Sequence, residues 1–348
     1  MEAFYQRGYD VYLISDSRCW VAPEPRIIPV YHLQPSSGTR FPRHAIPNML
    51  GVMRILKEIN PDFVHLHVQH FYSIANILSK IPFLLTSWGL EVETLPQIDF
   101  VRKSLARIAA MKASMVTVDA KCLQEIWVRM GIPEKKIELI PFGVDINVFN
   151  PDVDGRVIRK NLRIRKTDVV TISTRPFYNN NHYNVECLIR AIPLIVRSHE
   201  DAKFIIKGAG PLGGHLRRLV EKLDISKHVR FVGLVPYDKV PKYLSAADIY
   251  VSTCFVDSTS VSLLEAMACG LPPIVTDIPG NREWIEDGEN GFLFPPRNPK
   301  ALAEKVIQLI ENPSLRKRFG ERCFQIIKRR ATWQKCVSRM EAIYESLV

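Results

Sequence analysis

The sequence lacks several features that would place it at once in a class of protein. It contains no run of about 18 apolar residues, which argues against a membrane-spanning helix. Its first residues, MEAFYQRGYD, lack the apolar stretch of a signal peptide. Low-complexity segments and repeats of solenoid period are also missing. We therefore expect a cytoplasmic protein made of ordinary globular domains.

Cysteine is present, but not in the spacings that bind a metal or build a disulfide framework. The seven cysteines are scattered, with no Cys-x-x-Cys pair and no Cys/His spacing suited to zinc. We interpret them as reduced side chains of the core, and we expect no metal site.

Positive charge exceeds negative charge, and the excess is uneven. The formal net charge is +11, yet residues 1–150 hold 16 basic against 14 acidic side chains, and residues 151–348 hold 31 against 22. Basic runs at 156–166 and 316–330 lack the interleaved aromatic residues of single-strand binders, so we expect no nucleic-acid partner. Such runs are typical of solvated helix faces; the functional alternatives are an anionic substrate and an anionic membrane surface, which would place the protein at the inner face of the membrane.

Short apolar runs alternate with longer segments of helical period, the pattern of a parallel sheet with crossover helices. The predicted strands of the first half are 10–14, 27–33, 63–68, 83–87 and 115–118, and the predicted helices include 46–59 and 101–111. The predicted strands of the second half are 169–173, 203–206, 229–232, 249–252 and 273–276. The predicted helices of the second half are 185–197, 212–223, 240–246 and 260–269.

This alternation predicts an α/β protein with two doubly wound, Rossmann-like domains, joined by the turn-rich segment 140–151. We expect an N-terminal domain over 1–150, a C-terminal domain over 151–325, and a last helix, 326–348, that crosses back to the first domain. Ligands of such folds bind outside the carboxyl ends of the strands, which in a two-domain version face a central cleft. Because residues 1–8 resemble the end of an amphipathic helix, the first domain is expected to lack its opening strand, through either a misassigned start or a true truncation.

The strongest chemical signal is the segment from Asp257 to Gly270. A polar loop leads into a helix whose first turn is formed by Ser258, Thr259, Ser260, Val261 and Ser262. Free backbone amides and the positive end of the helix dipole at such a turn can hold a diphosphate. Glu265 lies eight residues after Asp257, which places the two carboxylates at different depths along one ligand. A carboxylate can accept both protons of a vicinal diol, which suits Glu265 to a ribose and Asp257 to the hydroxyls of a transferred sugar. From spacing alone, an N-capped core helix with two incidental acids is an equal interpretation.

The same segment resembles the signature of the family 4 glycosyltransferases of the GT-B fold, with Asp257 and Glu265 followed by Ala266-Met267-Ala268-Cys269-Gly270-Leu271-Pro272. Other segments that fall in the family order are 62–67, 140–145, 208–211, 232–233 and 283–292. The resemblance implies a retaining glycosyltransferase in which Glu265 holds the ribose of the donor nucleotide and Asp257 approaches the donor sugar. Asp257 stands where many members have Glu.

Members of that family also carry an Arg and a Lys after the first strand of the second domain, and these neutralise the departing diphosphate. Arg175 fits the Arg, with a structural ion pair as the alternative role. The residues from Pro176 to Tyr183 contain no lysine. Lys207, at the end of the next strand, is a candidate for the missing charge, and a solvated strand-end lysine is the alternative.

The turn after that strand satisfies the pattern Gly-x-Gly-x-x-Gly over 208–213, which raises the possibility of a dinucleotide site. The acidic partner of that fingerprint is missing, because the next strand ends in Val232-Gly233-Leu234. We therefore interpret Gly208, Gly210 and Val232 as a tight turn near the nucleotide base.

The acceptor side departs from the family. Where many members have a His-Gly pair, this chain has Trp88-Gly89, followed by Glu91. Trp88 can stack on a sugar face or support the cleft wall, but it cannot exchange a proton as imidazole does. Glu91 is a candidate for binding an acceptor hydroxyl or for capping the next helix. His65 and His67 share one face of a strand; we expect His65 to be buried and hydrogen-bonded, whereas His67 is equally suited to reach the cleft.

The first hypothesis is transfer of a sugar from a nucleoside-diphosphate sugar to an alcohol acceptor, which is a glycan, a lipid or a small molecule. Front-face attack assisted by the leaving phosphate is expected, with no divalent metal and no cofactor besides the co-substrate. The alternative is a catalytically silent sugar-nucleotide-binding protein or partner subunit, which Trp88, the missing lysine and the absent opening strand favour. The family 4 signature disfavours a third hypothesis, a GT-B sugar-nucleotide epimerase.

Overall fold

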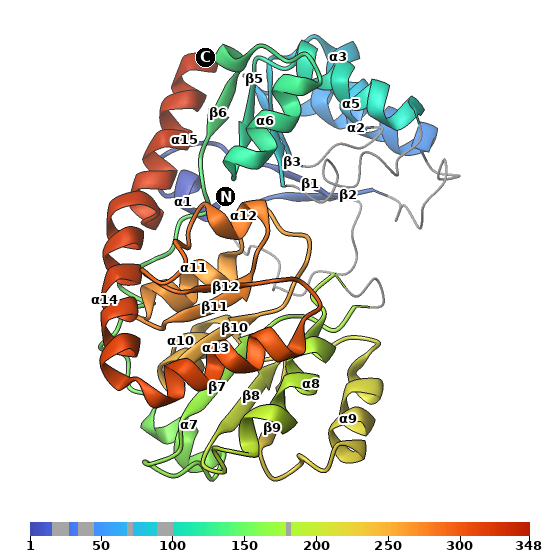
Figure 1. Ribbon diagram of the computed structural model, residues 1–348. Helices are drawn as coiled ribbons and strands as arrows, with labels where there is room; N and C mark the ends of the chain where they lie inside the picture. The colour runs from blue at the N-terminus through green and yellow to red at the C-terminus, as the bar shows by residue number, and fades with distance from the viewer. Residues whose placement is uncertain (16–27, 34–44, 68–71, 89–99, 179–181) are drawn as a thin grey trace. The chain divides into compact units, whose positions relative to one another are not determined.

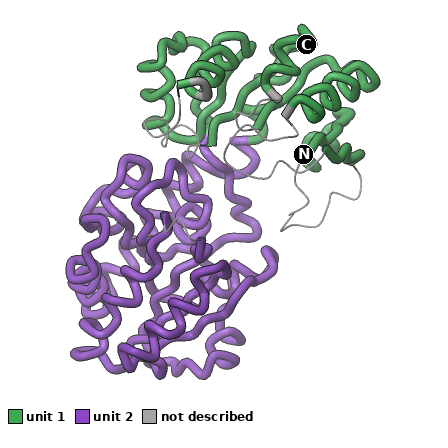
Figure 2. The backbone as a smooth tube through the Cα atoms, turned by 90° about the vertical axis from the view of Figure 1, so that its right-hand side faces the viewer, with its two compact units in different colours: residues 1–140, 337–348 green, residues 141–336 purple. Residues whose placement is uncertain are grey.

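A computed structural model describes residues 1–15, 28–33, 45–67, 72–88, 100–178 and 182–348. The chain divides into two compact units (Figure 2): unit 1 comprises residues 1–140 and 337–348, and unit 2 comprises residues 141–336. The last helix, α15 (Trp333–Leu347), therefore begins in unit 2 and ends in unit 1. No helix among the described residues is both long enough and apolar enough to cross a membrane.

Unit 1 contains a four-stranded and a two-stranded parallel sheet (Figure 1). The four-stranded sheet has the order β3 (Val64–His67), β4 (Phe83–Ser87), β5 (Met115–Val118) and β6 (Ile137–Leu139). The two-stranded sheet pairs β1 (Leu13–Ser15) with β2 (Val30–His32). The helical segments of this unit are α1 (Glu2–Tyr5), α2 (Ala45–Ile59), α3 (Tyr72–Ser79), α5 (Phe100–Lys112), α6 (Lys121–Arg129) and η2 (Glu134–Lys136).

Unit 2 is built on one six-stranded parallel sheet. Its strands, in spatial order, are β12 (Phe292–Phe294), β11 (Pro273–Thr276), β10 (Ile249–Ser252), β7 (Val170–Thr174), β8 (Lys203–Lys207) and β9 (Val229–Gly233). Its helices before β11 are α7 (Arg156–Asn161), α8 (Val185–Val196), α9 (Gly213–Lys222), η3 (Tyr237–Lys239), α10 (Val240–Ser245) and α11 (Val261–Ala268). Those after β11 are α12 (Pro279–Arg282), α13 (Pro299–Glu311) and α14 (Pro313–Arg330).

The central strands of unit 2 are covered on both faces. Side chains on successive residues of a strand point to opposite faces. On β10, Ile249 and Val251 join the core under α8, α9 and α13, whereas Tyr250 joins the core under α10, α11 and α14. All residues of β7 and β10 are buried, as is usual for parallel strands between two helical layers.

The strand order of unit 2 reverses next to β7. The chain continues from β7 to β8 and β9 on one side, then returns to place β10, β11 and β12 on the other side. The loops that leave β7 and β10 therefore diverge at neighbouring carboxyl ends. Such a topological switch point forms the binding crevice of open α/β sheets. The fold thus indicates where in unit 2 a ligand is to be sought.

The sequence prediction of an α/β fold with two Rossmann-like domains is confirmed, and β4, β5, β10 and β11 span the predicted residues. Two strands, β6 and β12, were missed. Both have three residues and lie at a sheet edge, so neither shows a periodic apolar pattern of useful length. In unit 1 the described chain opens with α1. The strand predicted at 10–14 is observed as β1, which begins only at Leu13 and ends one residue later than predicted, at Ser15.

Candidate functional site

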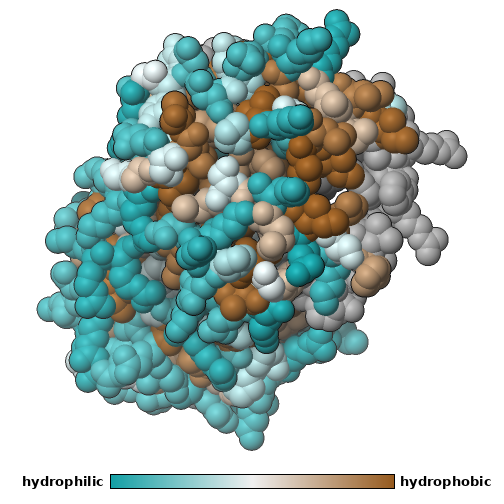
Figure 3. Space-filling view, turned by 90° about the horizontal axis from the view of Figure 1, so that it is seen from above, coloured by the Kyte–Doolittle hydropathy of each residue, from teal (hydrophilic) through white to brown (hydrophobic). Residues whose placement is uncertain are grey.

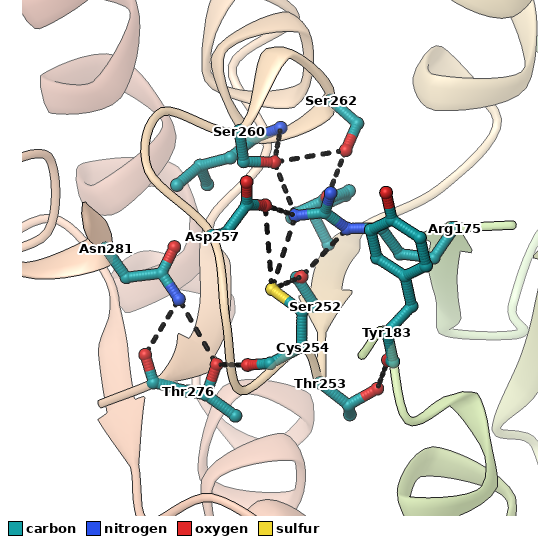
Figure 4. A network of polar contacts seen from close by, with 12 residues as sticks. Arg175, Tyr183, Ser252, Thr253, Cys254, Asp257, Ser260, Ser262, Thr276 and Asn281 are labelled. Atoms are coloured by element: carbon teal, nitrogen blue, oxygen red, sulfur yellow. Dashed lines mark hydrogen bonds and ion pairs between the residues drawn. The ribbon is translucent and has the colours of Figure 1, made fainter. Parts of the chain in front are cut away.

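The switch point of unit 2 brings together two loops that the sequence analysis singled out. Arg175 directly follows β7, and the segment from Thr253 to Ser260 connects β10 with α11. Because β7 and β10 are hydrogen-bonded neighbours, the two loops start side by side. Figure 4 shows the result: the side chain of Arg175 extends beneath the first turn of α11.

Arg175 forms the centre of a buried polar network (Figure 4). Its Nη2 lies 2.9 Å from Asp257 Oδ2 and 2.5 Å from Ser260 Oγ, and its Nε donates to Ser252 Oγ at 3.0 Å. The ring of Tyr183 lies 5.4 Å from the guanidinium carbon. Burial opposes the charged form, but neighbouring groups, Asp257 among them, outweigh it and raise the pKa of Arg175 above its ordinary value. The guanidinium is therefore a fixed positive charge below the helix.

The sequence left two roles open for Arg175, a phosphate contact and a structural ion pair. Arg175 forms the structural ion pair with Asp257, and only 6 % of the residue is exposed. A phosphate role requires that an anion share or replace this pairing. The ring of Tyr183 lies against Arg175 in the stretch from which the family's lysine is missing.

The first turn of α11 is held by its own serines. Ser260 is the N-cap, and its hydroxyl accepts a hydrogen bond from the Leu263 amide at 3.2 Å. Ser262 Oγ is paired with Tyr250 Oη at 2.9 Å. Ser258, Thr259 and Ser260 are all buried, whereas Val261 is 38 % exposed. The hydroxyls are thus largely engaged within the protein, and the expected anion donors are the backbone amides of the first turn, which have no intrahelical acceptor.

Glu265 lies one turn further along α11 and is 6 % exposed. Burial raises its pKa to about 7, although a hydrogen bond from Tyr237 and the positive charges of Lys207 and Arg175 lower it. The buried carboxylate is stabilised by a hydrogen-bond donor and by nearby positive charge. Hydrogen-bond donors of a ligand could replace Tyr237 in that role. Tyr237 is 64 % exposed, so the carboxyl lies directly beneath a surface side chain.

The two carboxylates that the sequence placed at different depths along one ligand have different partners in the structure. Asp257 belongs to the Arg175 network, and Glu265 belongs to a second group with Tyr237 and Lys207. Arg175 acts electrostatically on both. Lys207, predicted as a possible phosphate partner, lies at the end of β8 with its charge near Glu265, and burial lowers its pKa.

The glycines of the predicted turn allow two loops to approach closely. A Cβ atom at Gly208 would lie 2.1 Å from the carbonyl oxygen of Arg175, and one at Gly210 would lie 2.4 Å from that of Phe177. A side chain at either position would therefore displace the backbone of the loop that carries Arg175. Val232 lies in β9, whose last residue, Gly233, accepts a hydrogen bond from the Gly208 amide at 3.0 Å.

Thr276, Gly280 and Asn281 form a clamp behind the Asp257 loop that the sequence did not predict. Asn281 Nδ2 donates to the carbonyl and the hydroxyl of Thr276 at 2.8 and 3.2 Å, and Thr276 Oγ1 donates to the carbonyl of Cys254. A Cβ atom at Gly280 would lie 1.9 Å from the carbonyl oxygen of Ser258. Only glycine permits this approach of α12 to the loop. The available signal was the Pro279-Gly280 pair after a buried strand.

In unit 1, aromatic rings gather at the carboxyl ends of β3 and β4. The rings of His65 and His67 lie 4.0 Å apart, and His67 stacks on Trp88 with centroids 5.4 Å apart. His65 Nδ1 and Nε2 each lie 2.6 Å from a hydroxyl, those of Tyr344 and Thr86. His65 is hydrogen-bonded as expected, but it is half-buried and not fully buried. The loss of water around its ring holds its pKa well below the ordinary value. The other acceptor-side candidates, Gly89 and Glu91, lie outside the described residues.

The remaining polar groups give no metal centre within the ranges described above, where no three His, Cys, Asp or Glu side chains cluster suitably. None of the six cysteines that the structure describes is in a disulfide, and only Cys122 is not buried.

The chain matches two family models of glycosyltransferases. Residues 155–325 match the family model described as glycosyl transferases group 1, and residues 1–148 match that of glycosyltransferase family 4. A relative from Bacillus anthracis, N-acetyl-alpha-D-glucosaminyl L-malate synthase, is 26 % identical over 311 residues, which cover 88 % of this chain and 80 % of the relative. A GDP-mannose-dependent alpha-(1-6)-phosphatidylinositol monomannoside mannosyltransferase from Mycobacterium tuberculosis is 28 % identical, over 51 % of this chain and 48 % of the relative.

Solved structures establish the fold. Anabaena HepE in complex with UDP-glucose has a TM-score of 0.79 at 20 % identity and covers 92 % of this chain and 86 % of that one. Sucrose-phosphate synthase from Thermosynechococcus elongatus has a TM-score of 0.83 at 20 % identity and covers 99 % and 91 %. Both have the GT-B architecture of two Rossmann-like domains, which is the fold of this chain.

Proposed function

Because the chain belongs to the glycosyltransferase family matched by both family models, we propose that it transfers a sugar from a nucleoside-diphosphate sugar to an alcohol acceptor with retention of anomeric configuration. The observation that carries this proposal is the buried carboxyl of Glu265, held with its pKa near 7 beside the N-terminal turn of α11. The relatives whose names include GDP-mannose, and the neighbour bound to UDP-glucose, support a nucleotide sugar as the co-substrate.

The donor would be held along α11. Ionised Glu265 accepts hydrogen bonds from both hydroxyls of the ribose, and the amides at Val261 and Ser262 receive the diphosphate. Gly208, Gly210 and Val232 line the side of the nucleotide base. Lys207, next to Glu265, completes the positive charge around the donor.

The chemical step uses charge that is already in place. When the bond between the anomeric carbon and the phosphate oxygen breaks, negative charge grows on the diphosphate. The helix N-terminus and Arg175, which would share its pairing with Asp257 with the anion, stabilise that charge. Asp257 is held by Arg175 at 2.9 Å, which weakens it as a nucleophile and leaves it as an acceptor for sugar hydroxyls. This supports front-face attack by the acceptor hydroxyl, with the leaving phosphate taking its proton. These protein groups supply the compensating charge, so the proposal calls for neither a divalent metal nor a further cofactor.

On the acceptor side, the stacked pair of His67 and Trp88 offers an aromatic face to a sugar ring. Gly89 and Glu91 complete the proposed acceptor region by sequence alone.

The test is a thermal-shift panel of UDP-, GDP- and ADP-sugars, followed by the same panel on Glu265→Ala and on Glu304→Ala, a control on the exposed side of α13. We expect one nucleotide series to stabilise the wild type and the control, and Glu265→Ala to lose most of the response. NMR of the product formed with the active donor and a set of alcohols then reports the anomeric configuration. A panel without any response, or an inverted product, contradicts the proposal.

A silent binding protein is the second candidate, and one observation favours it. Trp88 occupies the position where the family's imidazole is expected, and it is stacked on His67. A nucleotide sugar that binds in the panel but is neither transferred nor hydrolysed would select this candidate over the enzyme.

A further inference from the structure

Helix α5 (Phe100–Lys112) of unit 1 has an outer face of unusual composition. At 3.6 residues per turn, Phe100, Lys103, Arg107 and Met111 fall on one side of the helix, with Ile108 beside them. All five are exposed: Phe100 by 83 %, Ile108 by 49 % and Met111 by 43 %. Among the described side chains of this helix, those of Ala106, Ala109 and Ala110 are buried. The exposed side of this helix is thus both apolar and basic.

Acidic residues are missing from the whole sequence of α5. The exposed side of a soluble helix ordinarily mixes both signs of charge, and large apolar side chains there are isolated. Here the exposed described side chains are either apolar or positively charged. On the face seen from above Figure 1, apolar side chains gather in patches broken by hydrophilic ones (Figure 3).

Positive charge continues from α5 onto its neighbours. Lys136 Nζ donates to the carbonyl of Met111 at 2.6 Å, and Arg107 Nε donates to the carbonyl of Met130 at 2.8 Å. The charge of Lys112 lies close enough to disfavour the charged form of Lys136, in addition to burial. Segment η2 contains one acidic residue, Glu134, and two lysines. Like charges held this close are complementary to an anionic surface.

We propose that the outer face of α5 is a docking surface for a bilayer with anionic lipid headgroups. Phe100, Ile108 and Met111 would enter the headgroup region, while Lys103, Arg107 and Lys112 would lie against lipid phosphates. This division of apolar and basic side chains is that of helices that lie in the membrane interface. Basic residues near an anionic leaflet each strengthen binding roughly fivefold.

The basic run of α14, which the sequence analysis linked to a membrane, fits less well. Across α14, all of which is described, no large apolar side chain is exposed, so charge is its only means of attraction. Its Arg322 is already paired with Glu289. The outer face of α5 in unit 1 is therefore better suited to a membrane contact than the basic run of α14 in unit 2.

The test is flotation of the full chain with vesicles of phosphatidylcholine alone or mixed with phosphatidylglycerol. We expect binding to the anionic vesicles only, weakened by salt. Phe100→Ser should weaken it about tenfold, the loss expected from one aromatic anchor, and Lys103→Glu at least fivefold. The matched control is Arg318→Glu. This substitution alters an exposed residue of α14 and changes the net charge by the same amount as Lys103→Glu, and it should retain binding.

Several results would overturn the proposal: no binding to anionic vesicles, equal binding to both vesicle types, or a loss with Arg318→Glu in place of the α5 variants. Sedimentation velocity adds a further test, because a dimer that Phe100→Ser dissociates would make this face an interface between two copies. All three side chains are on the surface, so the variants should keep the unfolding midpoint of the wild type. Their response to sugar nucleotides should also persist, which keeps this test independent of the donor site.

Discussion

Replacing Glu265 by glutamine should raise the stability of the protein without nucleotide while weakening donor binding. Burial raises the pKa of Glu265 from 4.5 to about 7 in the folded state. A carboxyl with a raised pKa favours folding while it is protonated, and that contribution is lost as the pH rises through about 7. The difference between the two pKa values corresponds to about 3 kcal/mol, an upper limit for the cost of the buried charge above pH 7.

Glutamine carries no charge at any pH, so Glu265→Gln should increase the free energy of unfolding by up to about 3 kcal/mol at pH 8 and by much less at pH 5. Urea titration followed by tryptophan fluorescence, without nucleotide, measures this difference. The control Glu304→Gln, on the exposed side of α13, should stay within about 0.5 kcal/mol of the wild type. A variant that is less stable than the wild type at pH 8, or a difference that does not depend on pH, would refute the reasoning.

Donor affinity should depend on pH in the opposite direction. The ribose hydroxyls need the ionised carboxylate as acceptor, so protonation of Glu265 competes with binding. The apparent affinity of the wild type should fall about tenfold per pH unit below about 7 and level off above it. Calorimetric titration with the nucleotide found in the panel measures this dependence, and a flat profile would show that Glu265 does not hold the donor.

Three further predictions concern the scaffold of the two units. Arg175→Ala leaves the half-buried Asp257 without its partner, so we expect a loss of about 3 kcal/mol in urea unfolding and a larger loss of affinity for nucleoside diphosphates than for nucleosides. Gly280→Ala, with its Cβ 1.9 Å from a carbonyl, should lose most of the thermal response to the donor. Gly288→Ala, where a Cβ atom would meet no atom within 4 Å apart from its chain neighbours, should keep that response and lose only the stability that the strain of its positive φ costs. Tyr344→Phe removes one hydrogen bond and should cost about 1 kcal/mol in unfolding free energy, measured at pH 8; an unchanged value would show that this bond is not made in solution.

The sequence was sufficient for the fold class and the family. Central strands such as β10 and β11 are continuous apolar runs, and the segment from Asp257 to Gly270 has a specific order of residue types. Both predictions are confirmed by the topology of the sheets and by the family matches. The edge strands β6 and β12 were missed because pairing to one neighbour, and not an apolar pattern, defines a three-residue strand.

The partners within the site were less predictable. Spacing placed Asp257 and Glu265 at different depths along one ligand, but it gave no sign that Asp257 pairs with Arg175, which is 82 residues away in the sequence. The clamp formed by Thr276, Gly280 and Asn281 depends on a backbone approach that only coordinates reveal. Tyr237, the neighbour of Glu265, lies in a short η3 segment without any chemical motif. Long-range contacts of this kind follow from the sheet topology and not from local sequence.

The most direct measurement of the central claim is calorimetric titration of the wild type and Glu265→Gln with the active nucleoside diphosphate and its 2′,3′-dideoxy analogue. Two hydrogen bonds to a charged carboxylate are together worth about 3 kcal/mol or more, so the wild type should bind the analogue at least 100-fold more weakly. In Glu265→Gln that difference should largely disappear. Equal affinity of the wild type for both nucleotides, or the same ratio in the variant, would contradict the assignment of Glu265 as the residue that holds the donor ribose.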